Sequence, residues 1–114
     1  MPKPHLEFVK VDMNEGWESP PGYPQTIQQK ILASDLDEGK KTGSRTRLLR
    51  FAPGAFTTQP FEHDFFEEVF VVRGELIVQG NPCDPYTYAC RPPHTPHGPF
   101  RSDAGCLLFE LHYY

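Results

Sequence analysis

The sequence predicts an all-β fold, organised as a single domain in the form of a sandwich or small barrel. The chain has 114 residues, enough for one hydrophobic core that needs no disulfide or structural zinc. Thirteen prolines and nine glycines lie between short apolar runs, which favours strands joined by turns over long helices. No amphipathic helical pattern interrupts these runs, and many short, regularly spaced strands are typical of a sandwich or barrel.

Residues 1–24 are expected to form an arm that packs on the barrel. A short strand is predicted at residues 6–11, followed by the turn-rich stretch NEGWESPPGYP. Trp17 and Tyr23 are the expected anchors of this arm, because they are its large aromatic side chains. We therefore expect the domain itself to cover residues 25–114.

Six further segments carry the strand pattern. Residues 45–51 alternate charged and apolar side chains, and Arg73 and Gly74 form a tight connection between two of the apolar runs. The six predicted strands are residues 26–32, 45–51, 67–72, 75–79, 86–90 and 106–114. A polar loop containing two glycines separates the first two of them.

Two neighbouring carboxylates are separated by the alternation of side chains along one of these strands. Successive side chains of a strand point to opposite faces of the sheet. Glu67 therefore shares a face with Val69 and Val71, whereas Glu68 shares the other face with Phe70. We expect Glu67 to face the interior and Glu68 to face solvent.

Composition and charge exclude several classes of partner. The formal net charge is -4, and Lys and Arg are not interleaved with aromatic residues, so a nucleic-acid surface is not expected. No stretch reaches the ~18 to 20 apolar residues of a membrane span, and the N-terminus lacks the apolar segment of a signal peptide. Cys83, Cys90 and Cys106 are odd in number and include no CxxC pair. Neither disulfides nor a zinc knuckle is predicted, and a cytoplasmic protein is expected.

His63, Glu67 and His97 form the constellation with the clearest chemical meaning. Imidazole and carboxylate ligands suit Fe, Mn, Ni, Zn or Cu, and two histidines with one carboxylate leave coordination positions open for a substrate. His63 and Glu67 flank the start of a predicted strand, and His97 lies in the proline-rich turn RPPHTPHGP. A rigid turn of this kind can hold an imidazole in a fixed position.

These residues occur in two stretches that resemble the paired motifs of the cupin superfamily. The first motif is a glycine followed by HxH, a glutamate and a second glycine, and residues 54–74 resemble it with His63, Glu67 and Gly74. The second has the form PxGxxH, and RPPHTPHGPF resembles it with Pro92 and His97. The two motifs and their flanking strands cover more than half of the chain.

The resemblance implies a cupin (RmlC-like jelly-roll) β-barrel whose inner face binds one divalent transition metal and a small molecule. It implies His63, Glu67 and His97 as the metal ligands, with Fe, Mn, Ni, Zn or Cu as the ion. It also implies a homodimer, since cupins commonly pair through sheet edges and N-terminal arms.

Two positions depart from the cupin pattern. Phe61 occupies the place of the first histidine of HxH, so the ligand set falls to two histidines and one glutamate. In an alternative register, Pro60 and Glu62 take the HxH positions. His94 stands at the glycine of PxGxxH and is expected to adopt a positive φ angle. The candidate replacements for the lost ligand are Gln59, Glu62, His94, His112 and water.

The leading functional hypothesis is a small metal-dependent enzyme acting on a carbonyl, enol or carboxylate compound, by a dioxygenase-like, lyase or isomerase reaction. Glu67 and Glu62 are the candidate catalytic groups. The candidate substrate-binding residues are Arg91, Arg50, Gln59, Phe61 and Phe66. Two alternatives are a non-catalytic module that binds or senses a small molecule, and a metal-free isomerase or dehydratase that uses His63 or His97 as its base.

Overall fold

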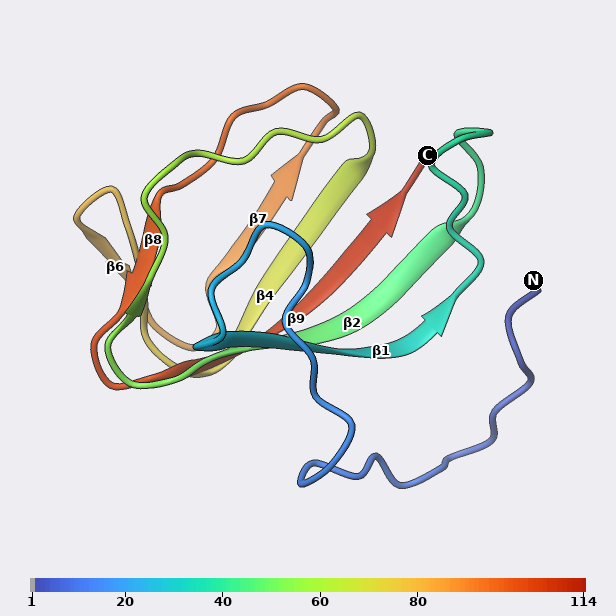
Figure 1. Ribbon diagram of the computed structural model, residues 1–114, viewed down its shortest axis with the longest axis horizontal. Helices are drawn as coiled ribbons and strands as arrows, with labels where there is room; N and C mark the ends of the chain where they lie inside the picture. The colour runs from blue at the N-terminus through green and yellow to red at the C-terminus, as the bar shows by residue number, and fades with distance from the viewer. Residues whose placement is uncertain (1) are drawn as a thin grey trace.

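The computed structural model describes residues 2–114, which form two antiparallel sheets around one core (Figure 1). The larger sheet has the strand order β1-β2-β9-β4-β7, and the smaller has the order β3-β8-β5-β6. The strands are β1 (Ile27–Ser34), β2 (Ser44–Phe51), β3 (Ala55–Phe56), β4 (Phe66–Gly74), β5 (Leu76–Val78), β6 (Asn81–Cys83), β7 (Tyr88–Arg91), β8 (Phe100–Ser102) and β9 (Cys106–Tyr113). The all-β jelly-roll prediction is confirmed, although the two sheets do not close into a continuous barrel.

Strand β9 is the centre of the larger sheet and determines the positions of its neighbours. It pairs with β2 from Cys106 to Tyr113 on one side and with β4 on the other. This register places Arg45 of β2 opposite His112, and His112 opposite Glu67 of β4. Residues far apart in the sequence are thereby brought into one row across the sheet.

The inner faces of these strands are apolar at one end and polar at the other. On β2, Phe51 and Leu49 belong to the hydrophobic core, whereas Arg47 and Arg45 follow toward the opposite end. The same change occurs along β4 and β9. The core consists of Ile27, Leu49, Phe51, Ala55, Val69, Val71, Leu76, Cys106 and Leu108. The fold thus gathers inward-facing charged side chains at one end of the larger sheet.

Three short strands were not among those predicted from the sequence. Strands β3, β6 and β8 are two or three residues long, which is too short for an alternating pattern to be recognised in the sequence. Pro82 lies in β6, which is an edge strand, where proline is tolerated. The described residues contain no helix long and apolar enough to cross a membrane.

The arm follows the outside of the domain, and only part of the prediction for it was right (Figure 1). The strand predicted at residues 6–11 is wrong, because this segment pairs with no neighbouring strand and Phe8 is fully exposed. Trp17 does pack on the domain, with its ring 4.0 Å from the Arg50 guanidinium. Glu18 then forms an antiparallel bridge with Gln29 of β1. The domain boundary after residue 24 stays a prediction.

We predict that Gly74→Ala destabilises the protein more than Gly80→Ala. Both glycines have positive φ, 78° and 81°, so the backbone term of roughly 1 kcal/mol is shared by the two variants. A Cβ at residue 74 would also collide with the backbone of Gly105, whereas one at residue 80 meets open space. We expect a total loss of at least about 2 kcal/mol for Gly74→Ala, measured by chemical denaturation. Equal losses in the two variants would contradict this.

Candidate metal centre

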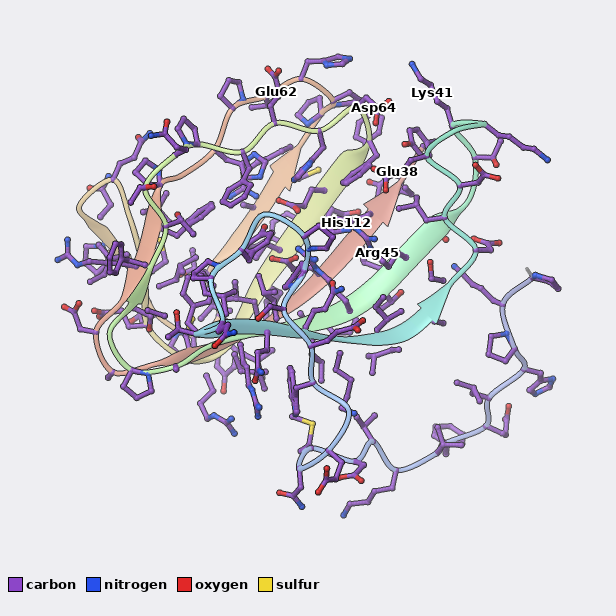
Figure 2. The ribbon with its side chains drawn as sticks, in the orientation of Figure 1. Glu38, Lys41, Arg45, Glu62, Asp64 and His112 are labelled. Carbon is purple, nitrogen blue, oxygen red and sulfur yellow. The ribbon has the colours of Figure 1, made fainter. Side chains whose placement is uncertain are left out.

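A row of four side chains crosses the larger sheet at its polar end. Arg45, His112, Glu67 and Arg91 are successive register partners on β2, β9, β4 and β7. We call these four residues the cross-strand row. Figure 2 shows Arg45 and His112 adjacent to one another within it. Since each strand alternates its side chains between faces, one shared register directs all four to the same side of the sheet.

Glu67 is the buried carboxylate of this row and is held from both sides. It is 3% exposed. Its Oε1 accepts a hydrogen bond from Arg91 Nη1 at 2.7 Å, and its Oε2 accepts one from His112 Nε2 at 2.7 Å. Each carboxylate oxygen has a second lone-pair direction that these bonds leave free. Glu67 is therefore fixed in orientation while it can still ligate a cation.

The protonation state of His112 follows from its neighbours. Arg45 donates from Nε and Nη2 to His112 Nδ1, at 3.1 and 2.7 Å, and arginine has no acceptor. Nδ1 therefore carries the lone pair and Nε2 carries the proton donated to Glu67. Burial lowers the pKa of His112 to about 3, so the ring is neutral. His112 positions Glu67 and has no free nitrogen with which to bind a metal.

His97 and His63 each turn Nε2 toward the same carboxylate. His97 Nδ1 lies 3.0 Å from the carbonyl oxygen of Thr95, which can only accept, so Nδ1 carries a proton and Nε2 is the nitrogen left to face Glu67. That atom lies 3.3 Å from Glu67 Oε1. His63 Nε2 lies 3.8 Å from Glu67 Oε2 and is buried without a hydrogen-bond partner among residues 2–114. Burial lowers the pKa of His63 to about 4, so this ring is also neutral.

These three residues fit a divalent transition metal. One ligand atom from each of His63, Glu67 and His97 lies within 4.8 Å of the others. An imidazole lone pair facing a carboxylate is unfavourable unless a cation or proton lies between them. Two imidazoles and one carboxylate are a known ligand set for Fe, Mn, Ni, Zn and Cu, and they leave further coordination positions open.

A second acidic cluster next to this one is a poorer fit. Glu67, Glu110 and His112 also lie close enough together to surround an ion. However, Glu110 Oε1 already accepts from Arg47 Nε and Nη2, at 2.8 and 2.7 Å, and both side chains are almost fully buried. Arg47 also donates to Gln29 at 2.8 Å. Removing Glu110 from a buried ion pair is costly, and His112 Nε2 holds a proton.

Phe61 occupies the place where the sequence motif expects a further histidine. Its backbone forms two hydrogen bonds with His97, at 2.7 and 2.9 Å, and so joins the two loops that carry the motifs. Its ring stacks on Tyr23 of the arm, with centroids 4.6 Å apart and planes 11° apart. Burial, with Glu110 nearby, raises the pKa of Tyr23 to about 12. An uncharged aromatic pair therefore closes this side of the site.

The second departure from the motif is His94, which was expected to adopt a positive φ. This prediction is confirmed, because the φ angle of His94 is 63°. Its backbone nitrogen donates to the carbonyl oxygen of His63 at 2.6 Å. His94 itself is exposed, so it contributes through its backbone by holding the loop of His63 in place.

Two cavities adjoin the three ligand residues. The inner cavity measures about 20 Å³, room for roughly one water or ion, and Glu67, Arg91 and His97 are among its walls. The mouth cavity measures about 270 Å³ and opens beside His63. Tyr23 borders both cavities. Of these two cavities, the mouth cavity is the one with room for a molecule larger than water.

The structure gathers only some of the residues proposed from the sequence. His63, Glu67, His97, Arg91 and Phe61 come together around the inner cavity and its rim. All five residues lie in the two motif stretches, residues 54–74 and RPPHTPHGPF, which local sequence patterns can identify.

The remaining proposed residues lie elsewhere. Arg50 is on the outer face of β2, where it donates to Gln28 and lies over Trp17. Phe66 is on the outer face of β4, stacked on Tyr113. Gln59 and Glu62 are exposed on the loop before His63.

Four residues of the site were not among those proposed from the sequence. Alternation along β1, β2 and β9 puts every second side chain on the inner face, but only the pairing of the strands shows which face is the inner one. An inward-facing charge in an otherwise apolar strand is unusual enough to mark a site. These residues are Gln29, Arg45, Arg47 and Glu110.

Two antiparallel sheets in jelly-roll arrangement, with histidines and a carboxylate clustered at one end, define a cupin. The chain belongs to the ChrR cupin-like domain family, whose model matches residues 13–113. A search of curated proteins found no match.

Solved structures show the same fold at low sequence identity. An acetylacetone dioxygenase from Acinetobacter johnsonii has a TM-score of 0.73 at 17% identity, over 96% of this chain and 75% of its own. An RmlC-like cupin from Shewanella frigidimarina has a TM-score of 0.71 at 19% identity, over 99% and 94%. A chain in the complex of Rhodobacter sphaeroides SigE with the anti-sigma ChrR has a TM-score of 0.66 at 16% identity, over 88% of this chain and 50% of its own.

We predict that His112 makes the stability of the metal-free protein depend on pH. The folded state lowers the pKa of His112 from 6.5 to about 3, so the unfolded chain binds the extra proton as the pH falls below 6.5. The free energy of unfolding is therefore highest, as far as His112 determines it, above pH 6.5, and it decreases as the pH falls toward about 3. Between about pH 7 and about pH 5, wild type should lose about 2 kcal/mol more than His112→Gln. Parallel denaturation curves for the two proteins would contradict this.

Proposed function

We propose that this protein is a metal-dependent cupin enzyme that acts on a small carbonyl, enol or carboxylate compound. The observation that supports this most strongly is the convergence of the Nε2 atoms of His63 and His97 on the Glu67 carboxylate. A purely structural cluster would have paired the buried His63 Nε2 with a hydrogen-bond partner. The reaction class, whether dioxygenase-like, lyase or isomerase, is part of the proposal.

His63, Glu67 and His97 are the residues that would hold the ion. A bound divalent ion would supply Lewis acidity, polarising a substrate oxygen and stabilising an enolate. Arg91 and His112 would keep the Glu67 carboxylate oriented, as outer partners of metal ligands commonly do.

The surrounding side chains would keep this chemistry away from bulk water. Phe65 stacks on His63 with centroids 4.6 Å apart, and the Tyr23 and Phe61 pair covers the opposite side. Excluding water strengthens the electrostatic interactions within a site. Glu62 is exposed, so a role for it as base requires the substrate to extend toward the solvent edge of the loop.

The metal-free isomerase or dehydratase is less well supported. An efficient general base has a pKa near the operating pH. Burial lowers the pKa of His63 to about 4, which makes it a weak base at neutral pH. His97 Nε2 already faces the Glu67 carboxylate, so neither ring presents itself to a substrate as a base.

A ligand-sensing module is the second candidate, and the arm favours it. Tyr23 belongs to the arm yet stacks on Phe61 and borders both cavities. A ligand in the mouth cavity would contact the arm directly, which would couple occupancy to the position of the arm. One structural neighbour, at 16% identity, is a chain in the complex of Rhodobacter sphaeroides SigE with the anti-sigma ChrR.

The enzymatic proposal can be tested by turnover of β-dicarbonyl and 2-oxo-acid compounds after loading with Fe(II), Mn(II), Ni(II), Zn(II) or Cu(II). We expect turnover with at least one ion, loss on chelation, and loss in His97→Ala. His94→Asn is the matched control, because it alters an exposed histidine of the same loop whose positive φ asparagine also accepts. Ligand binding without turnover by any loaded form would favour the sensing module.

We also predict that Phe61→His increases metal affinity. The substitution places an imidazole where the cupin motif has its first histidine, beside His97, and a further ligand should lower the dissociation constant by about tenfold or more. Competition with a chromophoric chelator measures this constant.

The control for that experiment is Phe61→Leu, which also removes the phenyl ring but adds no ligand. It should leave the affinity unchanged or lower. An equal constant for wild type and Phe61→His would show that residue 61 does not face the ion.

A further inference from the structure

The mouth cavity has a wall of basic and aromatic side chains. Arg45 and His112 come from the cross-strand row, His63 and Phe65 from the motif loop, and the arm closes the remaining side. The complete lining is Pro20, Pro21, Tyr23, Gln29, Glu38, Arg45, Arg47, His63, Phe65 and His112. Its volume of about 270 Å³ is just below the range of drug-sized pockets, so it suits a ligand of a few heavy atoms.

Arg45 is the unusual member of this wall. It is half buried, and within residues 2–114 both of its side-chain hydrogen bonds go to His112 Nδ1. Among residues 2–114, no carboxylate lies within ion-pair distance of it. Burial and the nearby charge of Arg47 lower the pKa of Arg45. A guanidinium has five N–H donors, so Arg45 retains donors that no protein acceptor uses.

The other charges around the site cancel in pairs. Arg47 pairs with Glu110 at 2.7 Å, and Arg91 pairs with Glu67 at 2.7 Å. His112 accepts from Arg45 at Nδ1 and donates to Glu67 from Nε2, so it is the neutral tautomer, and His63 Nε2 is buried without a hydrogen-bond partner among residues 2–114. Glu38 is exposed at the rim of the cavity (Figure 2), where solvent screens its charge. Among residues 2–114, Arg45 is therefore the guanidinium of the mouth cavity that has no carboxylate within ion-pair distance.

We propose that the ligand of the mouth cavity is a small organic monoanion whose carboxylate binds Arg45 and whose remaining oxygen groups point toward His63. A planar guanidinium matches the two oxygens of a carboxylate. A single positive charge favours a monoanion over a doubly charged phosphate. This inference deepens the proposed function, on which it rests for identifying the mouth as the substrate cavity.

Arg45 replaces the two arginines that the sequence suggested for this role. Arg91 already binds Glu67 at 2.7 Å, so using it for a substrate would release the carboxylate that it orients. Arg50 faces the other side of the sheet, against Gln28 and Trp17. Arg45 alone of the three combines access to the mouth cavity with a charge that no carboxylate neutralises.

The test compares acetoacetate with acetylacetone, which has nearly the same shape but no carboxylate. Binding is measured by calorimetry and by NMR shift titration, on metal-free and on Zn(II)-loaded protein, with inorganic phosphate as a third probe. We expect wild type to bind acetoacetate about tenfold or more tightly than acetylacetone. Phosphate should bind more weakly than acetoacetate.

Two variants assign the effect to Arg45. Arg45→Gln keeps a donor for His112 Nδ1 but loses the charge, and it should lose acetoacetate affinity by about tenfold or more while acetylacetone affinity is unchanged. Arg101→Gln is the matched control, because Arg101 is an exposed arginine paired with Asp103 outside the mouth cavity. It should bind both compounds as wild type does.

Several results would overturn the inference. These are equal affinities for the two compounds in wild type, no saturable binding of acetoacetate, tighter binding of phosphate, or acetoacetate binding that survives Arg45→Gln. Because the wild-type comparison needs no variant, a folding defect in Arg45→Gln would not obscure the result. If Zn(II) does not load but Arg45-dependent acetoacetate binding persists, the metal proposal fails and the anion site stands. If Zn(II) loads but acetoacetate binding does not depend on Arg45, the anion site fails and the metal proposal stands.

Discussion

The site depends on one constraint, which is that the buried Glu67 carboxylate must be satisfied inside the protein. A buried carboxylate without partners is unfavourable. Arg91 and His112 supply its partners from the neighbouring strands on either side, and Arg45 fixes the tautomer of His112. The register of β9 makes all of these contacts possible at once. Because both oxygens of Glu67 are held, the Nε2 atoms of His63 and His97 face a carboxylate of fixed orientation.

The sequence predicted those parts of the site that are encoded locally. The ligand triad lies in two short motifs, and alternation within one strand was enough to turn Glu67 inward and Glu68 outward, as their burial confirms. Glu110 and Arg47 depend on pairing between strands that are about half the chain apart, which a local pattern does not contain. The same alternation puts Arg50 on the face opposite to Arg47 and Leu49. Which of the two faces is the outer one is decided by the pairing of β2 with its neighbours. The unpaired segment at residues 6–11 has strand composition but no neighbouring strand edge to complete it.

Phe61 links the metal centre to the arm. In place of an imidazole it provides a ring that stacks on Tyr23, while its backbone bridges to His97. The arm therefore forms part of the wall of both cavities instead of being an appendage. If His63, Glu67 and His97 hold an ion, the aromatic pair covers one side of the site, and the mouth cavity, where Arg45 lies, opens beside His63. The metal proposal and the anion proposal thus describe two ends of one small-molecule site.

The measurement that tests the central claim most directly is the metal content of wild type, His97→Ala and His94→Asn after purification and reconstitution with Fe(II), Mn(II), Ni(II), Zn(II) or Cu(II). The account predicts about one equivalent of one ion in wild type and in His94→Asn. His97→Ala should retain a small fraction of it, because two protein ligands hold a divalent ion poorly. Substoichiometric metal in wild type under every condition, or equal metal in wild type and His97→Ala, would contradict a centre formed by His63, Glu67 and His97.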